Sequence, residues 1–199
     1  MKINRIVINN YRLLKDFSLD LERDLSLIIG KNNTGKTSIL SVIEKFLNST
    51  DLSRFSNDDF NLNFKESLKE SLDGEALISD GIKLYIYIDY EETDDLSNIS
   101  KVMMDLDPDN NMIVLGFEYI LSESAHFKFK SDYKGFLENE NTKKHTDNQY
   151  KPKDFNYFFK HNYSTYFKHF RKSIKYNHIS KEIDLKKFNR RKIIDYYGY

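Results

Sequence analysis

The chain contains no cysteine, no tryptophan and only two prolines among its 199 residues. Without cysteine it forms no disulfide and offers no thiolate to a metal ion. No apolar run approaches the roughly 20 residues that a membrane-spanning helix needs, and the N-terminus lacks the apolar stretch of a signal peptide. We therefore expect a cytoplasmic protein that has no membrane partner.

The net charge is zero, but the charges are unevenly distributed. Residues 1–140 carry 16 Lys and Arg against 26 Asp and Glu, whereas residues 141–199 carry 15 against 5. The basic C-terminal third has two interpretations. It contacts nucleic acid, or it is a basic surface that either packs on the acidic part or is simply solvated.

The most informative stretch is Gly30–Ser38, which reads G-x-x-x-x-G-K-T-S, the pattern of a phosphate-binding (Walker A) loop. Glycines allow the backbone to approach phosphate oxygens, and the loop amides and the N-terminus of a following helix direct donors at the anion. In this pattern Lys36 supplies a charge to the β- and γ-phosphates. The Thr37 hydroxyl is placed to ligate Mg²⁺.

The flanking sequence favours a true phosphate loop. Leu25–Ile29 is a short apolar run that predicts a buried strand ending at Gly30. After the loop, apolar residues recur at helical spacing from Thr37 to about Asn48. A phosphate loop needs this strand and this helix. The alternative is a Gly/Asn turn between a strand and a helix that matches the motif by chance.

Two further strands are predicted before the loop, over residues 2–9 and 17–21. This lead-in resembles the nucleotide-binding heads of ABC, SMC and RecF-type ATPases. Their chains open with a strand, an N-F-[RK] segment, a second strand and a G-x-N-x-x-G-K-[ST] loop. The matching segments here are Asn10-Tyr11-Arg12, Phe17-Ser18-Leu19 and Gly30–Ser38.

Within these heads, the chain is most similar to the N-terminal ATPase segment of OLD-family proteins (overcoming lysogenization defect), of which the Gabija defence ATPase is a relative. The similarity covers residues 1–64. It implies an α/β fold, a P-loop NTPase of ABC/SMC-head type with an antiparallel β-subdomain, in incomplete form. The parts would be residues 1–64 (strand pair, Walker A loop and first helix), 65–137 (helix and antiparallel meander) and 138–199 (basic, aromatic-rich segment).

The resemblance also implies ATP and Mg²⁺ as cofactors. The residues that it assigns to the nucleotide are Arg12, Gly30, Asn32, Asn33, Thr34, Gly35, Lys36, Thr37 and Ser38. For Arg12 the alternative is an exposed arginine in a turn.

The metal residues would be Thr37 and Asp59. ABC-type heads carry a glutamine that touches Mg²⁺ after the first helix, and none stands here. Asp59-Phe60 resembles an Asp-Phe pair of OLD-like sequences, and a carboxylate suits Mg²⁺. The alternative is an Asx turn that caps the next helix, for which Asn57 or Asp58 would serve equally well.

Residues 82–89 end in Asp89 and superficially resemble a Walker B strand. Tyr85 and Tyr87 alternate there with aliphatic residues, which indicates an antiparallel strand with one partly exposed face rather than a strand buried in a parallel sheet. We therefore do not assign Asp89 to Mg²⁺.

The remaining sequence predicts further elements by pattern. Expected helices cover residues 64–72, 96–106, 154–159 and 185–194. Expected strands cover residues 112–121, 126–130 and 163–176, with a polar flexible loop at 138–153.

Several parts of a complete head are missing from the sequence: an L-S-G-G-Q-like signature, a Walker B strand with a catalytic Glu, a switch histidine and an acidic Toprim-like cluster. We therefore expect an N-terminal fragment, or a naturally truncated product, of a larger ATPase in DNA processing or phage defence. Its partners would be a second head in a homodimer or the missing C-terminal half, with DNA bound by the intact protein.

Two other functions remain as alternatives. A non-catalytic remnant would bind a nucleotide or a partner protein only. A self-contained small kinase would need a basic lid and an acceptor site, and the position of the loop argues against it. A GTPase would need an N-K-x-D motif, which is absent.

The missing parts predict weak or absent ATP hydrolysis by this chain alone, because transfer to water requires Mg²⁺, phosphates and the attacking water to be positioned together. Phosphate release by the purified chain measures this. A turnover number in the ordinary enzyme range that is lost in Lys36→Ala would contradict the prediction.

Overall fold

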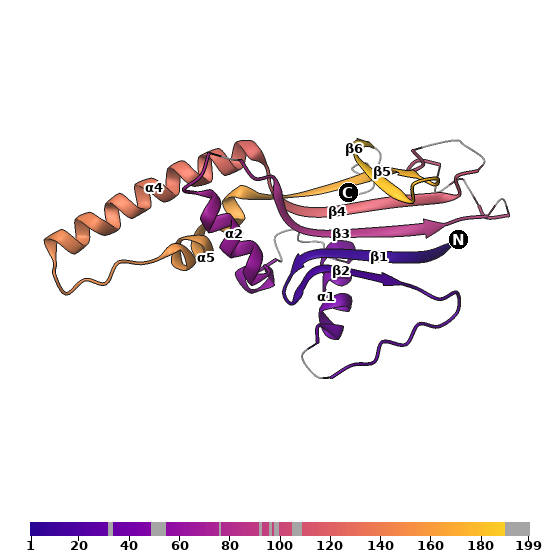
Figure 1. Ribbon diagram of the computed structural model, residues 1–199, viewed down its shortest axis with the longest axis horizontal. Coiled ribbons are helices and arrows are strands. Elements are labelled where there is room, and N and C mark those ends of the chain that lie inside the picture. Colours follow the sequence, from indigo (N-terminus) through magenta and orange to yellow (C-terminus); the bar gives the residue numbers. More distant parts are fainter. Residues whose placement is uncertain are drawn as a thin grey trace.

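The structure is a computed structural model in which one antiparallel sheet is flanked by helices (Figure 1). Its side chains are described as far as residue 186. The described backbone covers residues 1–31, 34–48, 55–75, 77–91, 93–95, 97, 100–104 and 109–189.

The sheet has six strands in the order β2-β1-β3-β4-β5-β6, and every neighbouring pair is antiparallel. The strands are β1 (Lys2–Tyr11), β2 (Leu14–Asp20), β3 (Asp80–Asp89), β4 (Met112–Leu121), β5 (Phe167–Asn177) and β6 (Glu182–Asn189). The helical elements are α1 (Lys36–Leu47), the 3₁₀ turn η1 (Asn57–Asp59), α2 (Leu62–Ser71), α4 (Glu123–Thr146) and α5 (Phe155–Tyr166). The predicted antiparallel arrangement of residues 82–89 and 112–121 is confirmed.

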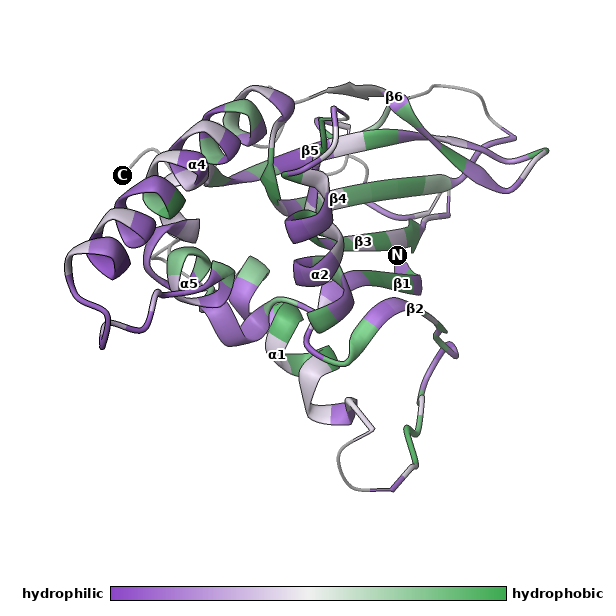
Figure 2. Cartoon of the chain, turned by 60° about the vertical axis from the view of Figure 1, so that its left-hand side comes forward, coloured by the Kyte–Doolittle hydropathy of each residue, from purple (hydrophilic) through white to green (hydrophobic). Residues whose placement is uncertain are grey.

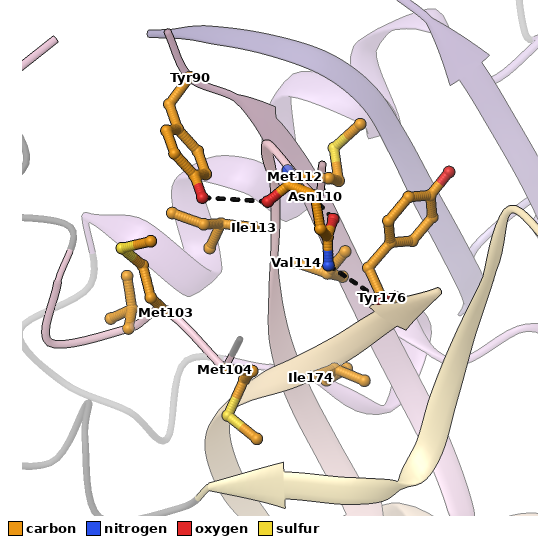
Figure 3. Close-up of a pocket in the computed structure, with 10 residues that line it drawn as sticks. Tyr90, Met103, Met104, Asn110, Met112, Ile113, Val114, Ile174 and Tyr176 are labelled. Carbon is orange, nitrogen blue, oxygen red and sulfur yellow. Dashed lines mark hydrogen bonds between the residues drawn. The ribbon is translucent and has the colours of Figure 1, made fainter. Parts of the chain in front are cut away.

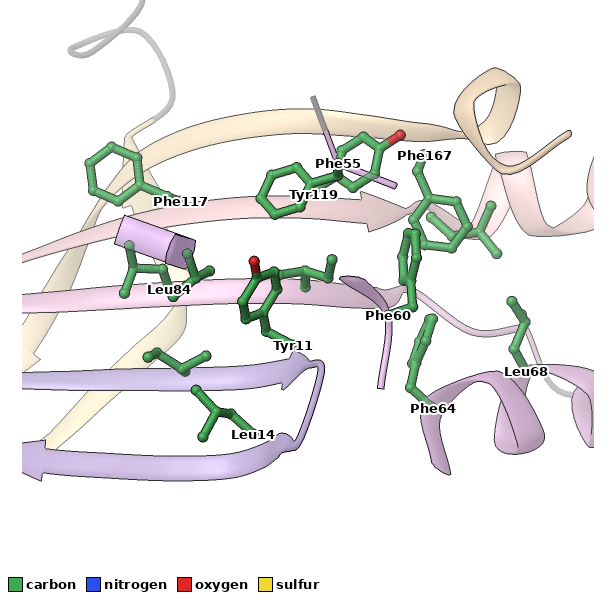
Figure 4. Packing of buried hydrophobic residues seen from close by; sticks show 14 of the residues in the cluster. Tyr11, Leu14, Phe55, Phe60, Phe64, Leu68, Leu84, Phe117, Tyr119 and Phe167 are labelled. Carbon is green, nitrogen blue, oxygen red and sulfur yellow. The ribbon is translucent and has the colours of Figure 1, made fainter. Parts of the chain in front are cut away.

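One face of the sheet carries the main hydrophobic core, onto which α1, α2 and α5 pack (Figure 4). Phe60 lies at its centre and is 2 % exposed. The centroid of its ring lies 4.8 Å from that of Phe167 on β5, 5.1 Å from Phe159 on α5 and 5.8 Å from Phe64 on α2. These ring contacts join the sheet to the helices. Each aromatic pair contributes about 0.5–1.5 kcal/mol in addition to the free energy gained from its buried area.

The opposite face carries a smaller cluster around Tyr85, Val114 and Ile174. Gly116 makes room for it, because a Cβ there would lie 2.8 Å from the Ile174 Cδ1 and 3.2 Å from the Tyr85 ring. Tyr85 is buried, and its hydroxyl donates to Glu118 at 2.9 Å. The expectation of a partly exposed tyrosine face on this strand is therefore wrong at Tyr85.

The predicted strand over residues 25–29 is wrong. This segment has no regular secondary structure, and it runs along the outside of the molecule as the long connection between β2 and α1 (Figure 2). Leu25, Leu27 and Ile29 are 76 to 83 % exposed. An apolar run of this kind forms a strand only beside other strands, and all neighbours within the described sheet are already paired antiparallel without it.

The predicted strand over residues 126–130 is also wrong, because these residues belong to the 24-residue helix α4. Ser122 caps the helix by accepting from the Ala125 N–H at 3.3 Å. In Figure 1 α4 and α5 extend beyond the end of the sheet as a helical arm. No helix in the described part of the chain is long and apolar enough to cross a membrane.

The predicted flexible loop over residues 138–153 is helical as far as Thr146. The remainder is tied back to α4 by Glu140, which accepts from Lys143 Nζ at 2.7 Å, from the Lys153 N–H at 2.9 Å and from the Tyr150 hydroxyl at 2.7 Å. These three donors lower the pKa of Glu140 to about 2. A local polar network therefore orders a segment whose composition indicates a flexible loop.

Toward the C-terminus the predictions hold in part. The helix capped by Asp154 is confirmed and runs on to Tyr166, so the strand expected from residue 163 begins only at Phe167. The helix expected over 185–194 is wrong for residues 185–189, which pair with β5 as part of β6; the rest lies outside the described residues. Of the helix expected over 96–106, residue 97 is helical and residues 100–104 are not, so the prediction is wrong there; the other residues lie outside the described part.

His126 on α4 makes stability depend on pH. It is fully buried, its Nδ1 accepts from the Ile78 N–H at 3.1 Å, and its Nε2 lies 2.9 Å from the Ser71 hydroxyl, so the neutral ring fits. Burial and then Lys130 lower its pKa. The unfolded chain takes up a proton near the ordinary value of about 6.5, so stability is lost as pH falls from there toward the lowered pKa.

The melting temperature should accordingly fall between pH 7.5 and 5.5, by roughly 2–4 °C for each kcal/mol lost. His126→Gln should remove most of this pH dependence, whereas His161→Gln, on the exposed side of α5, should retain it. Equal pH dependence in both variants would contradict the assignment.

Candidate functional site

The predicted phosphate loop leads directly into α1, which begins at Lys36 as expected. Gly35 precedes the helix with φ 89°, a left-handed conformation that glycine adopts without strain. Its carbonyl accepts from the Ser38 and Ile39 N–H groups at 3.0 and 3.3 Å. The helix is anchored by its buried residues Ser38, Ile39, Val42 and Phe46.

Side chains of the loop donate to the loop's own backbone carbonyls. Lys36 Nζ donates to the carbonyl of Gly30 and to that of Lys31, the latter at 2.6 Å, and the Thr34 hydroxyl donates to the Lys31 carbonyl at 2.9 Å. A Cβ on Gly30 would lie 3.1 Å from Thr34 Oγ1 and 3.6 Å from Lys36 Nζ, so Gly30 lies against both side chains. The Lys36 ammonium thus sits among backbone carbonyls that an anion can replace as its partner.

Thr37 and Ser38 differ in exposure. Thr37 is exposed at the first turn of α1, whereas Ser38 is 8 % exposed. The amides of Lys36 and Thr37, the first two residues of the helix, have no acceptor within it and carry the positive end of its dipole. Donors, a cation and an accessible hydroxyl therefore lie together at this end of α1, as phosphate and Mg²⁺ require. Asn32 and Asn33 lie outside the described residues.

Arg12 lies in the turn between β1 and β2, with φ 49°. Leu14, just after this turn, packs against Gly35, since a Cβ on Gly35 would approach the Leu14 side chain to 2.9 Å. The turn therefore supports the loop. The Arg12 guanidinium is 40 % exposed and binds the Asp59 carboxylate, with both Nε and Nη2 2.9 Å from Oδ1. Sequence reasoning singled out both residues, and the structure brings them together as an ion pair.

Asp59 has further partners that sequence reasoning missed. Lys45 on α1 lies 2.9 Å from its Oδ2, and the Ser56 N–H and hydroxyl donate to the same oxygen at 2.8 and 3.0 Å. Burial acts to raise the pKa of Asp59, but the Ser56 N–H and the Lys45 ammonium outweigh it and leave that pKa below its usual range. The Ser-x-x-Asp spacing, a capping-box pattern, was the available sequence signal for Ser56.

Asp89 is remote from the loop. It pairs with Lys2 at the start of β1, whereas the turn that touches Gly35 follows the end of β1 at Tyr11. A ten-residue strand spans about 30 Å. The Asp89 carboxylate accepts from the Asn4 side chain at 2.5 Å.

Two hollows lie elsewhere. One, lined by residues such as Tyr90, Met103 and Ile174, measures about 10 Å³ and accommodates at most one water (Figure 3). The other, about 340 Å³, lies between β1, β2, β3 and α2, and much of its charge is paired internally, with Lys83 Nζ 2.7 Å from Asp80. No described residue of the phosphate loop lines either.

Comparison with known proteins identifies the family of this chain. The family model described as "AAA ATPase domain" matches residues 1–199. The chain belongs to the AAA ATPase domain family. This membership supports an ATPase-like fold and an ATPase over the whole chain.

This AAA ATPase domain is also similar to proteins named "DNA replication and repair protein RecF". The identity over 43 residues is 46 % for RecF of Histophilus somni (strain 2336), 44 % for that of Haemophilus ducreyi and 42 % for that of Actinobacillus pleuropneumoniae serotype 5b. The alignment covers 22 % of this chain and 12 % of each of these relatives. The similarity therefore concerns a short segment of RecF.

Gly35 provides a test of the loop geometry. Gly35→Ala should destabilise the fold by about 1–3 kcal/mol, because the left-handed backbone strains any L-residue whatever Leu14 does. Gly135→Ala is the matched control: nothing lies within 4 Å of a Cβ there, and alanine within α4 should stabilise by about 0.5–1 kcal/mol. Urea unfolding measures both, and equal stabilisation by the two substitutions would refute the described loop.

Proposed function

We propose that this AAA ATPase domain binds ATP with Mg²⁺ at the loop Gly30–Ser38, and that the protein acts as an OLD- or RecF-like ATPase in DNA processing or phage defence. The observation that carries the proposal is the Lys36 ammonium, held among loop carbonyls at the start of α1 beside the accessible Thr37 hydroxyl. Membership of the AAA ATPase domain family supports an ATPase.

Each residue has a defined task in this proposal. The backbone of Gly30, Thr34 and Gly35 wraps the phosphates, and the N–H groups at the start of α1 donate to them. Lys36 exchanges its carbonyl partners for the β- and γ-phosphate oxygens, and Thr37 contributes a hydroxyl to the metal. Bound Mg²⁺ supplies charge neutralisation of the phosphates.

The other nucleotide residues of the sequence analysis remain part of the proposal. Ser38 contributes through its backbone, since its side chain is buried. Arg12 contributes through the exposed part of its guanidinium. Asn32 and Asn33 complete the loop.

The activity of a whole protein is a wider proposal. The relatives' printed name concerns DNA replication and repair, and the segment of similarity is short. Exposed basic side chains on the helical arm, including Lys144 and Lys160, would attract the phosphates of DNA. A second head in a homodimer, or a separate C-terminal half, would supply the residues that polarise the attacking water.

Thermal unfolding with and without Mg-ATP tests the proposal. A ligand at 100 times its Kd stabilises by about 2.7 kcal/mol, so the melting temperature should rise, and Lys36→Ala should abolish the rise. Lys31→Ala, which changes an exposed lysine of the same loop, should retain it. Stabilisation that survives in Lys36→Ala would contradict nucleotide binding at this loop. Stabilisation without phosphate release would favour the non-catalytic alternative.

A further inference from the structure

Asp59 is buried where three separate segments of the chain meet. It is 1 % exposed and lies in η1. Its carboxylate holds Arg12 from the β1–β2 turn, Lys45 from α1 and Ser56 from the start of η1, all at 2.8 to 3.0 Å. Among the described residues, it thus links the helix that carries Lys36 to the turn that supports Gly35.

The bonding capacity of this carboxylate is already used. Its two oxygens offer about four lone-pair positions. They receive two N–H groups of Arg12, the Lys45 ammonium, and the N–H and hydroxyl of Ser56. An oxygen that ligates Mg²⁺ would have to give up one of these buried donors, which would then lack a partner.

The location of Asp59 also separates it from Thr37. Lys45 lies about 12 Å farther along α1 than Thr37, by the rise of the helix. Residues that share one Mg²⁺ lie within about 4 Å of each other at their ligand atoms, since each Mg–O distance is about 2.1 Å. Asp59 is bound to the far part of α1, whereas Thr37 stands at its start.

Backbone contacts make the same junction rigid. The Arg12 N–H donates to the Asp59 carbonyl at 2.8 Å, the Asn61 N–H donates to the Asn10 carbonyl at 3.0 Å, and the Asn61 side chain donates to the Arg12 carbonyl at 2.5 Å. The left-handed backbone of Asn10 and Arg12 is thereby held in place. On the α1 side, the Tyr11 hydroxyl lies 2.9 Å from the Ser41 hydroxyl.

We infer that Asp59 is a positioning residue for the phosphate loop and not a ligand of Mg²⁺. By holding Lys45 and Arg12 together, it fixes α1 against the β1–β2 turn, and so fixes Lys36 and the helix amides relative to Gly35. This inference rests on the proposed function. It replaces the metal role that the sequence suggested for Asp59.

The two roles differ in how they depend on the metal. A lost positioning residue weakens the binding of ATP whether or not Mg²⁺ is present, because the phosphate cradle itself is displaced. A lost metal ligand weakens only the binding of Mg-ATP. A residue that merely stabilises the fold changes neither affinity at a temperature at which the variant is folded.

The experiment is calorimetric titration of the full chain with ATP, once in Mg²⁺ and once in EDTA, at 10 °C, with circular dichroism to verify folding. Asp59→Asn should weaken binding about tenfold in both buffers, a modest loss for a cradle that is displaced rather than removed. Thr37→Val should weaken binding in Mg²⁺ only.

Lys45→Met tests the same inference if Asp59→Asn does not fold, because it removes only the α1 side of the junction. It should weaken binding several-fold in both buffers, whereas Lys69→Met, on the exposed side of α2, should leave both affinities unchanged. A loss confined to Mg²⁺ in Asp59→Asn, or unchanged affinity in folded Asp59→Asn and Lys45→Met, would overturn the inference. Failure of the wild-type chain to bind ATP would instead overturn the proposed function beneath it.

Discussion

The ion cluster around Asp59 is the constraint on which the candidate site depends. A buried carboxylate is stable only when its charge is compensated, and here the compensation comes from Arg12 in the β1–β2 turn and Lys45 on α1. Directly after this turn, Leu14 at the start of β2 limits the space at Gly35. The phosphate loop therefore owes its shape to contacts that lie outside the motif, and the motif residues alone do not define the site.

The neighbour of Asp59 connects this cluster to the rest of the fold. Phe60 packs against Phe159 of the helical arm and Phe167 of β5. Phe55, just before Ser56, stacks on Tyr119 of β4 with ring centroids 5.1 Å apart, and its carbonyl accepts from the Tyr163 hydroxyl at 2.9 Å. The segment that supports α1 thus belongs to the same core as the sheet and the helical arm. A displacement of the sheet or of the arm would therefore also displace the loop.

Local patterns predicted much of the fold. The alternation in β1, β3 and β4 and the apolar spacing in α1 and α2 reflect neighbours on the same element, so the sequence displays them directly. The strand prediction for residues 126–130 was wrong because these five residues alternate as in a strand. The helical spacing of the inward positions His126, Phe129, Tyr133 and Phe136 is visible only over a longer window. The strand prediction for residues 25–29 was wrong because an apolar run becomes a strand only when other strands flank it.

The candidate site was predictable to the same extent. The loop is a contiguous motif and was found from the sequence, whereas Lys45 and Ser56 were not, because their roles come from converging on Asp59 in space.

The most direct test of the account is hydrogen exchange at the amides of residues 34–37, with and without Mg-ATP, in the wild-type chain and in Lys36→Ala. The account predicts that nucleotide slows exchange at these amides in the wild-type chain, since they donate to phosphate oxygens, and leaves Lys36→Ala unchanged. Exchange at these amides that does not respond to saturating nucleotide in the wild-type chain would contradict it.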